Sequence, residues 1–447
     1  MVSTDLSPLF TDSGDKYNVD DASIIERLDI NADIHDNSSP EELNERVATL
    51  FNQMFALDMS VEASQVSVNR LTDGFTNLVY SVTVDPAPTV PTDQALRILC
   101  VHAEQQQQET TQMPDKYLLR IYGTSTEVFN SRDKELHWIK QLTYCKIGPQ
   151  IYGIFENGRL EEFFESTTLT QEDIRNALTS RQIAQRMCEL HTLVGRHIPA
   201  EGDAEKQNNG ATAAYLGKKP DLWTNIDALM GFMQNNWPEI RRKCDVNMQC
   251  AELLDNWHKV EQAVNKFKGY IEKDVHSPIV FAHNDLSYSN ILRLEGSDEI
   301  MLIDYEFSGY NYRGFDIANY FFTWMYNFSN LENPHHLDST RYPTVEQRHN
   351  FLRAYVQAKA LMDADISGLG SNSAHLAELS TTCLTDDQIR EEVAALDREV
   401  ASFVAAPFLQ WGLFGLLKTY SGDIDIDFID FIPQRLSWFL SQVANIK

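Results

Sequence analysis

The chain has 447 residues, of which 43% are hydrophobic and 11% aromatic, so it can build folded cores and wholesale disorder is excluded. Its 37 Lys and Arg residues against 65 Asp and Glu residues give a formal net charge of −28, which disfavours nucleic acid and anionic membrane surfaces as partners. A chain of this length predicts two lobes around a cleft, together with tails.

Targeting segments and disulfides are not expected from the sequence. The N-terminal stretch MVSTDLSPLFTDSGD is acidic, unlike a secretory or transit peptide. The most apolar stretch, residues 403–417, is interrupted by Pro407 and Gln410 and is too short for a membrane span. The six cysteines lack the paired spacing of zinc sites, and a chain of this size needs no disulfides. These features predict a cytoplasmic protein with free thiols.

The first part of the chain predicts a tail followed by a small lobe. Residues 1–39 are rich in Asp, Ser and Asn and predict a mobile acidic tail. Ser39 and Pro40 then precede EELNERVATLFNQMF, which has helical spacing of apolar residues. From Val66 the chain changes to the strand-like runs VSVNRL, LVYSVTV and KYLLRIYG, then to a helical segment and further strand-like runs. Residues 40–165 therefore predict an N-terminal lobe built on a small β-sheet.

Residues 166–447 predict a larger, mostly helical C-terminal lobe. Long helical patterns with few breakers occupy residues 171–195, 222–272, 345–363 and 386–420. Residues 198–220 are poor in apolar side chains and predict an inserted loop. The predicted fold class is therefore α+β with two lobes.

Residues 280–319, VFAHNDLSYSNILRLEGSDEIMLIDYEFSGYNYRGFDIAN, carry the strongest chemical signal. An apolar run ends in HND with Asp285, Asn290 follows, and a second apolar run, IMLID, ends in Asp304. Metal-assisted phosphoryl transfer needs such a set, because one carboxylate can accept the proton of an attacking hydroxyl while the amide and the other carboxylate bind magnesium. In the alternative interpretation these residues only cap turns and a helix.

This passage resembles the catalytic core of the choline/ethanolamine kinase family, a branch of the protein-kinase-like fold. The resemblance rests on HNDxxxxN followed by IDYEFSGYNYRGFDIAN and covers most of residues 64–440. It implies ATP and Mg²⁺ as cofactors, Asp285 as the catalytic base, and Asn290 and Asp304 as magnesium ligands. Glu306 matches the acidic residue of the family's D-[FY]-E motif, which implies support for a second metal ion.

The turn TDGFTN between two predicted strands resembles the nucleotide loop of this family. Gly74, Thr76 and Asn77 would let backbone N–H groups approach the phosphates. Taken without the resemblance, a single glycine in a turn favours a plain hairpin.

Two further positions are implied for the nucleotide. Arg120 in YLLRIYG resembles the basic residue that holds the phosphates, and Glu135 resembles the acid that pairs with it. The alternative for Arg120 is an exposed charge at a strand edge. Glu162 stands in the predicted hinge that would hold adenine, at a position where members of the family have glutamine.

A choline site needs aromatic faces and nearby negative charge, because a quaternary ammonium offers no N–H donors. Trp411 and Phe414 share one face of a predicted helix, although a buried core face is the alternative interpretation. The resemblance implies an acceptor pocket that contains Phe307, Thr323, Phe328, Trp411, Phe414 and Phe431. Tyrosine is frequent in the family at the positions of Phe307, Phe328 and Phe431. Phe414 stands where choline kinases have a second tryptophan, and Thr323 stands where they often have glutamate.

The implied activity is ATP-dependent phosphorylation of choline, ethanolamine or both to the phosphomonoester, the first step of phosphatidylcholine and phosphatidylethanolamine synthesis. The segments NYRGFD and WMY favour choline, with ethanolamine as a second substrate. One alternative is a kinase of another small hydroxylated amine, because aminoglycoside and fructosamine kinases share the HxDxxxxN and ID elements. The other is a catalytically silent scaffold, although Asp285, Asn290 and Asp304 are all present. Dimers are common in the family, which implies a homodimer.

Overall fold

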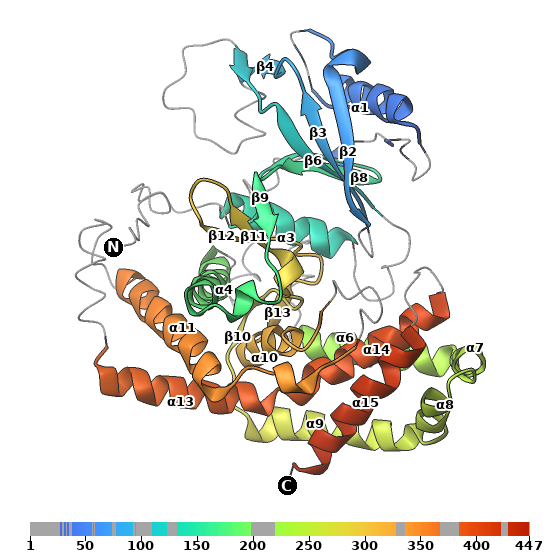
Figure 1. The fold of residues 1–447 in the computed structure, drawn as a ribbon, viewed down its shortest axis with the longest axis vertical. Helices are drawn as coiled ribbons and strands as arrows, with labels where there is room; N and C mark the ends of the chain where they lie inside the picture. The colour runs from blue at the N-terminus through green and yellow to red at the C-terminus, as the bar shows by residue number, and fades with distance from the viewer. Residues whose placement is uncertain are drawn as a thin grey trace, which may run out of the picture. The chain divides into compact units, whose positions relative to one another are not determined.

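The computed structural model describes residues 27–28, 31–32, 34, 38–55, 57, 59–73, 77–92, 94, 110–122, 132–145, 147–197, 220–327, 336–366, 384–421 and 428–446. These residues form two compact units, which divide between Glu165 and Ser166. The N-terminal unit is built on a sheet and the C-terminal unit is mostly helical (Figure 1). The predicted α+β class is therefore confirmed.

The sheet of the N-terminal unit has the strand order β1-β7-β8-β6-β3-β2. Its strands are β1 (Arg27–Leu28), β2 (Val66–Asp73), β3 (Asn77–Val84), β6 (Lys116–Tyr122), β7 (Ile151–Phe155) and β8 (Gly158–Glu162). Neighbours are antiparallel, except β1 and β7, which are parallel. A separate two-stranded sheet pairs β4 (Thr89–Pro91) with β5 (Thr110–Gln112). The three strand-like runs read from the sequence are therefore the neighbours β2, β3 and β6.

Helix α1 (Pro40–Met54) begins where the sequence predicts it. The Ser39 hydroxyl accepts from the Glu42 N–H at 3.3 Å, and the Glu42 carboxylate accepts from the Ser39 N–H at 2.9 Å, so the two residues form a capping box. The helix places Phe51 against Tyr117 of β6, with ring centroids 5.0 Å apart. Helix α3 (Arg132–Tyr144) also belongs to this unit, and η3 (Ala63–Gln65) is a short 3₁₀ turn.

The predicted mobile tail, residues 1–39, is wrong in its last part. Strand β1 pairs with β7, and the side chain of Asn157 accepts from the Ala32 N–H at 2.9 Å and donates to the Ala32 carbonyl at 3.1 Å. Ala32 and Ile34 are 4% and 3% exposed. Buried apolar side chains and a paired backbone hold this segment on the N-terminal unit. Residues 1–26 lie outside the described chain.

The C-terminal unit contains a long series of helices and two small sheets. Its helices are α4 (Ala177–His197), α6 (Asp221–Asn235), α7 (Trp237–Cys244), α8 (Met248–Asp255), α9 (Trp257–Asp274), α10 (Arg313–Thr323), α11 (Val345–Ile366), α13 (Asp386–Ser402), α14 (Ala405–Ser421) and α15 (Phe428–Ala444), with 3₁₀ turns η4 (Asp173–Arg175), η6 (Tyr288–Asn290) and η7 (Ser339–Arg341). The sheets pair β10 (Ile279–Ala282) with β13 (Gly309–Tyr312), and β11 (Ile291–Leu294) with both β12 (Ile300–Leu302) and β9 (Ser166–Thr168). The insertion predicted at 198–220 lies outside the described residues apart from Pro220.

Two of the long helical patterns are broken in the structure. Residues 222–272 belong to the four helices α6 to α9, and Asn247 caps α8 by accepting from the Cys250 N–H at 2.9 Å. Residues 386–420 belong to α13 and α14, which separate beside the fully buried Phe403. Apolar residues continue to face the core through each break, so their periodicity alone did not reveal it.

Asp386–Ser421 is a stretch with the length and hydropathy of a membrane span, and its mean hydropathy reaches 1.7. In the structure, 72% of the most apolar 18-residue window in this stretch is buried, and the stretch is divided between α13 and α14. Leu409, Leu413 and Leu416 are completely buried on α14. These residues therefore serve as core of the C-terminal unit.

Candidate active site

Two small ladders of the C-terminal unit place the polar residues of the HND and ID segments. Asp285 follows the end of β10, Asn290 ends the 3₁₀ turn before β11, and Asp304 follows β12. The Asn290 carbonyl accepts from the Ile303 N–H at 3.0 Å, which continues the pairing of β11 with β12 beyond its last residue. The structure therefore brings Asn290 beside the residue that precedes Asp304.

Asp285 and Asn290 are in direct contact. The Asn290 side-chain amide donates to the Asp285 carbonyl at 2.8 Å and lies 3.4 Å from the Asp285 carboxylate. Burial raises the pKa of Asp285 well above its usual value, and repulsion by Asp304 and Glu306 raises it further. Asp304 and Glu306 thus lie close enough to Asp285 to repel its carboxylate, and a bound cation would relieve this repulsion.

The donor set fits magnesium better than zinc. Within the described residues, no group of three or more His, Cys, Asp and Glu side chains could hold a metal. The predicted ligands are instead the carboxylates of Asp304 and Glu306 and the amide oxygen of Asn290, whose nitrogen end is turned toward Asp285. Magnesium uses one or two carboxylates together with water and substrate phosphates, whereas zinc prefers histidine and cysteine.

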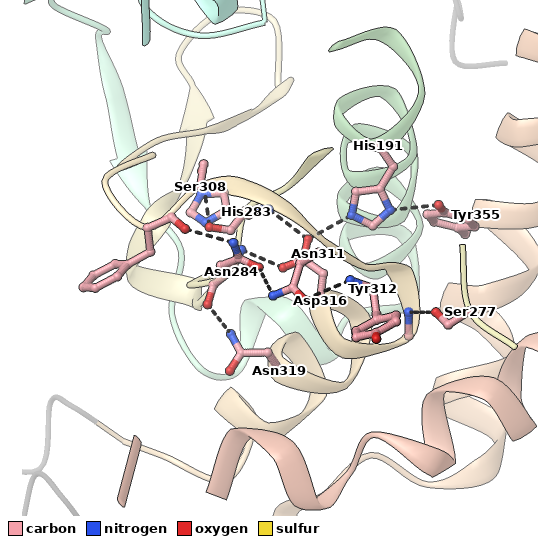
Figure 2. Close-up of polar contacts among 12 residues, drawn as sticks. His191, Ser277, His283, Asn284, Ser308, Asn311, Tyr312, Asp316, Asn319 and Tyr355 are labelled. Carbon is pink, nitrogen blue, oxygen red and sulfur yellow. Dashed lines mark hydrogen bonds and ion pairs between the residues drawn. The ribbon is translucent and has the colours of Figure 1, made fainter. Parts of the chain in front are cut away.

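Asp316 of α10 holds the backbone of the HND segment (Figure 2). Its carboxylate accepts from the His283 N–H at 3.0 Å, from the Asn284 N–H at 2.7 Å, and from His191 Nε2 of α4 at 2.9 Å. Asp316 is completely buried. Burial alone would raise the pKa of Asp316, but its hydrogen bonds with His191 and with the Asn284 N–H help to outweigh burial and the pKa is lowered.

The side chain of Asn284 is also fully engaged, although its backbone has a positive φ of 66°. Its amide nitrogen donates to the Phe307 carbonyl at 2.9 Å, and its amide oxygen accepts from Asn311 at 2.8 Å. Asn319 donates to the Asn284 carbonyl at 3.1 Å (Figure 2). These bonds hold the residue before Asp285 in a conformation that is uncommon for a residue other than glycine.

Sequence reasoning missed His191, Asn311, Asp316 and Asn319 as supports of the site. The last three lie in YNYRGFDIAN, and the resemblance implied no role for them. Their signal was a polar residue among aromatic or apolar neighbours, Asn311 on β13 and Asp316 and Asn319 on the apolar helix α10. His191 had no comparable signal, because it lies in an ordinary helical pattern far away in sequence.

Three of the predicted acceptor rings form one cluster. The ring centroids of Phe307 and Trp411 are 5.8 Å apart, those of Phe307 and Phe414 are 6.4 Å apart, and those of Trp411 and Phe414 are 5.5 Å apart, all edge to face. Trp411 Nε1 donates to the Asn319 side chain at 2.9 Å, and Asn319 in turn holds Asn284. The cluster is therefore tied to the HND segment by hydrogen bonds.

Two of the predicted rings already contact a cation of the chain itself. The Arg435 guanidinium lies 3.4 Å from the Phe431 ring centroid, and the Lys418 ammonium lies 5.4 Å from that of Phe414. Each contact uses one face of its ring.

Thr323 is buried, and its hydroxyl donates to the Tyr320 carbonyl at 2.7 Å. This hydroxyl therefore retains oxygen lone pairs and brings no charge. Phe328 lies outside the described residues.

The predicted nucleotide residues belong to the N-terminal unit. Asn77 begins β3 and is 4% exposed, whereas Gly74 and Thr76 lie outside the described residues. Glu162 ends β8, where its carboxylate accepts from the Gln150 N–H at 3.1 Å. Arg120 lies on β6 between β3 and β8 and is 8% exposed, so the alternative of an exposed edge charge is wrong.

Arg120 belongs to a buried network of charges. Its guanidinium lies 3.3 Å from the Glu161 carboxylate, which is also bonded to Arg159. Arg159 contacts the Glu135 carboxylate at 2.6 Å and is 1% exposed. Burial alone would raise the pKa of Glu161, but Arg159 and Arg120 outweigh it and the pKa is lowered. Glu135 therefore joins Arg120 in one network through Arg159 and Glu161, two residues that sequence reasoning missed.

Comparisons with known proteins agree on one family. A family model described as choline/ethanolamine kinase matches residues 68–440. The choline/ethanolamine kinase of Homo sapiens is 29% identical over 337 residues, which cover 74% of this chain and 74% of that protein. The choline kinase of Schizosaccharomyces pombe is 30% identical over 325 residues, which cover 69% of this chain and 66% of that protein.

A solved structure of a Plasmodium vivax ethanolamine kinase matches with a TM-score of 0.64 at 23% identity, covering 97% of this chain and 96% of that one. A choline kinase from Cryptosporidium parvum matches with a TM-score of 0.56 at 20% identity, covering 89% and 94%. These likenesses bear on the fold and confirm the predicted protein-kinase-like architecture.

We predict that Arg159→Met lowers the free energy of unfolding by about 3–5 kcal/mol, because it leaves two buried carboxylates without their shared partner. Urea denaturation followed by circular dichroism measures the change. Arg242→Met is the control, because Arg242 pairs with Glu239 in full contact with solvent. Equal effects of the two variants would show that the buried network adds no stability.

A second prediction concerns the raised pKa of Asp285. A carboxyl whose pKa rises on folding lowers stability as the pH rises above its pKa in the unfolded chain. Asp285→Asn should therefore raise the melting temperature of the metal-free protein by a few degrees at about pH 8, and by less at about pH 5. Thermal melts in a chelator test this, with the exposed Asp298→Asn as control. A gain that does not depend on pH would contradict the raised pKa of Asp285.

Proposed function

Because the chain belongs to the choline/ethanolamine kinase family, we propose that it transfers the terminal phosphoryl group of ATP to the hydroxyl of choline or ethanolamine. The product is the phosphomonoester, the first intermediate toward phosphatidylcholine or phosphatidylethanolamine. The observation that carries the proposal is the contact between Asp285 and Asn290 beside the acids Asp304 and Glu306.

Asp285 is the proposed catalytic base. Its carboxylate takes the hydroxyl proton of the alcohol as the new oxygen–phosphorus bond forms and the bond to ADP breaks. The amide of Asn290 orients this carboxylate. Burial raises the pKa of Asp285 above its usual value, so its carboxylate is a stronger base than an ordinary aspartate.

The remaining acids and the N-terminal unit serve the nucleotide in this proposal. Asn290, Asp304 and Glu306 would hold Mg²⁺, which neutralises phosphate charge when it is bound. We assign Gly74, Thr76, Asn77, Arg120 and Glu162 to nucleotide binding. The burial of Arg120 beside Glu161 supports this assignment, because its partners hold the guanidinium in one orientation.

The acceptor's ammonium group is assigned to the aromatic cluster of Phe307, Trp411 and Phe414, with Thr323, Phe328 and Phe431 as further pocket residues. Ring faces attract a methylated cation without hydrogen bonds, whereas a primary ammonium needs oxygen acceptors. Phenylalanine and threonine in place of tyrosine and glutamate remove hydroxyls and a charge that choline kinases have, whereas the segments NYRGFD and WMY resemble choline kinases. From these segments we propose choline as the preferred substrate and ethanolamine as the second.

We further propose that the protein acts in the cytoplasm. Cys145, Cys188, Cys244 and Cys250 are free thiols, which suits a reducing compartment. A homodimer is proposed from the family resemblance alone, and light scattering after gel filtration measures it. Another small hydroxylated amine remains the competing acceptor, and assays with several alcohols decide between them.

We predict that Asp285→Asn lowers kcat by about 10²–10⁴-fold while the protein stays folded, because proton transfer from the alcohol is lost. Asp304→Asn should instead raise the magnesium concentration needed for half-maximal activity, since it weakens a ligand. A coupled ADP-release assay over a magnesium series measures both. Near-normal turnover in Asp285→Asn removes it as the base, and an unchanged magnesium requirement in Asp304→Asn removes it as a ligand.

We also predict that Trp411→Ala raises the KM for choline by roughly 2–30-fold, which corresponds to the loss of a cation–π contact of about 0.5–2 kcal/mol, and leaves the KM for ATP nearly unchanged. Trp411→Phe keeps a ring and should lose less. Phe414→Trp should favour choline over ethanolamine, whereas Thr323→Glu should improve both acceptors through its added charge. If none of these variants changes either acceptor KM, the cluster is only core.

A further inference from the structure

Tyr355 of α11 lies outside every part of the proposed machinery, but its hydroxyl is 2.8 Å from His191 Nδ1. Figure 2 shows the Tyr355 hydroxyl directed at the His191 ring. The two rings meet edge to face with centroids 5.6 Å apart, and Tyr355 is 1% exposed. The other ring nitrogen of His191, Nε2, is 2.9 Å from the Asp316 carboxylate. Tyr355 of α11, His191 of α4 and Asp316 of α10 therefore form one buried line of hydrogen bonds, which ends at the backbone of the HND segment.

The order of donors along this line follows from the chemistry of each group. A carboxylate only accepts, so His191 Nε2 carries the proton that bonds to Asp316. In the tautomer that carries its proton on Nε2, Nδ1 is the acceptor and takes its hydrogen bond from the Tyr355 hydroxyl. Burial raises the pKa of Tyr355 well above its usual value, so the hydroxyl stays protonated. Tyr355 therefore donates to His191, and His191 donates to Asp316.

The backbone at the end of this line of hydrogen bonds depends on Asp316 staying in place. Asp316 accepts from the N–H groups of both His283 and Asn284, and Asn284 has the positive φ that costs free energy in a residue other than glycine. Asp285 is the next residue. A shift of the Asp316 carboxylate would therefore move the backbone that presents the proposed base.

We propose that Tyr355 is a positioning residue for phosphoryl transfer: it holds His191 in the tautomer that donates to Asp316 and so keeps the HND backbone in place. This inference rests on the proposed function. It makes α11, which supplies no residue to the proposed site, a determinant of turnover.

The first test is Tyr355→Phe, which keeps the ring and removes only the hydroxyl. The kcat should fall about three- to tenfold, the effect of one buried hydrogen bond, while the KM values for ATP and choline change less than about twofold. Tyr270→Phe is the matched control, because its hydroxyl bonds to Ser402 in the same unit at 3.1 Å. Equal kcat in Tyr355→Phe and the control overturns the inference.

The second test separates positioning from general stability. In His191→Gln, the amide can replace Nε2 as the donor to Asp316 without needing Tyr355. Adding Tyr355→Phe to this variant should then cause no further loss of kcat, whereas a merely structural tyrosine would cost the same in both backgrounds.

The third test does not depend on activity, so it distinguishes failure of this inference from failure of the proposed function. Amide hydrogen exchange in a peptide that contains His283 and Asn284 should be at least about threefold faster in Tyr355→Phe than in Tyr270→Phe. Unchanged exchange would show that Tyr355 does not hold this backbone, whether or not the protein phosphorylates an alcohol.

Discussion

Asp316 is a fully buried carboxylate, and an ion in that position has to be offset by hydrogen-bond donors on every side. Two of its donors are the backbone amides of the HND segment and a third is His191. The backbone amides stabilise the buried carboxylate, and the carboxylate in turn gives the amides of this loop a hydrogen-bond acceptor. The position of Asp285 and its contact with Asn290 depend on the hydrogen bonds between Asp316 and these backbone amides.

The N-terminal unit uses the same principle with a different set of groups. Arg159 and Arg120 offset the buried carboxylates of Glu135 and Glu161 inside the sheet and its helix. A single neighbour would leave part of each charge uncompensated, so the groups occur as a network and not as one pair. Such a network fixes the direction of Arg120, which a solvent-exposed arginine on a strand would not have.

The aromatic cluster is part of the hydrogen-bonded support of the HND segment. Trp411 is tied to the HND segment through Asn319, so the rings and the proposed base share one set of hydrogen bonds. Lys418 and Arg435 contact rings that the sequence assigned to the acceptor. The chain's own cations therefore already occupy one face of each of these two rings.

Much of this protein was determined by the sequence alone. The two secondary-structure patterns predicted the α+β class, because each depends only on neighbouring residues. The spacing of Asp285, Asn290 and Asp304 predicted a group of catalytic oxygens, since short strands and turns connect them. The resemblance of the same passage implied the family, which the comparisons confirmed.

Other features were decided only by the tertiary structure. Sequence reasoning did not find His191 or Tyr355, whose contacts join helices more than a hundred residues apart in sequence. It also did not show that Arg159 and Glu161 share the charges of Arg120 and Glu135. Local patterns report which side of a helix or strand is buried. They do not report which distant partner meets it there, because that depends on how the elements pack, and packing is a property of the whole chain.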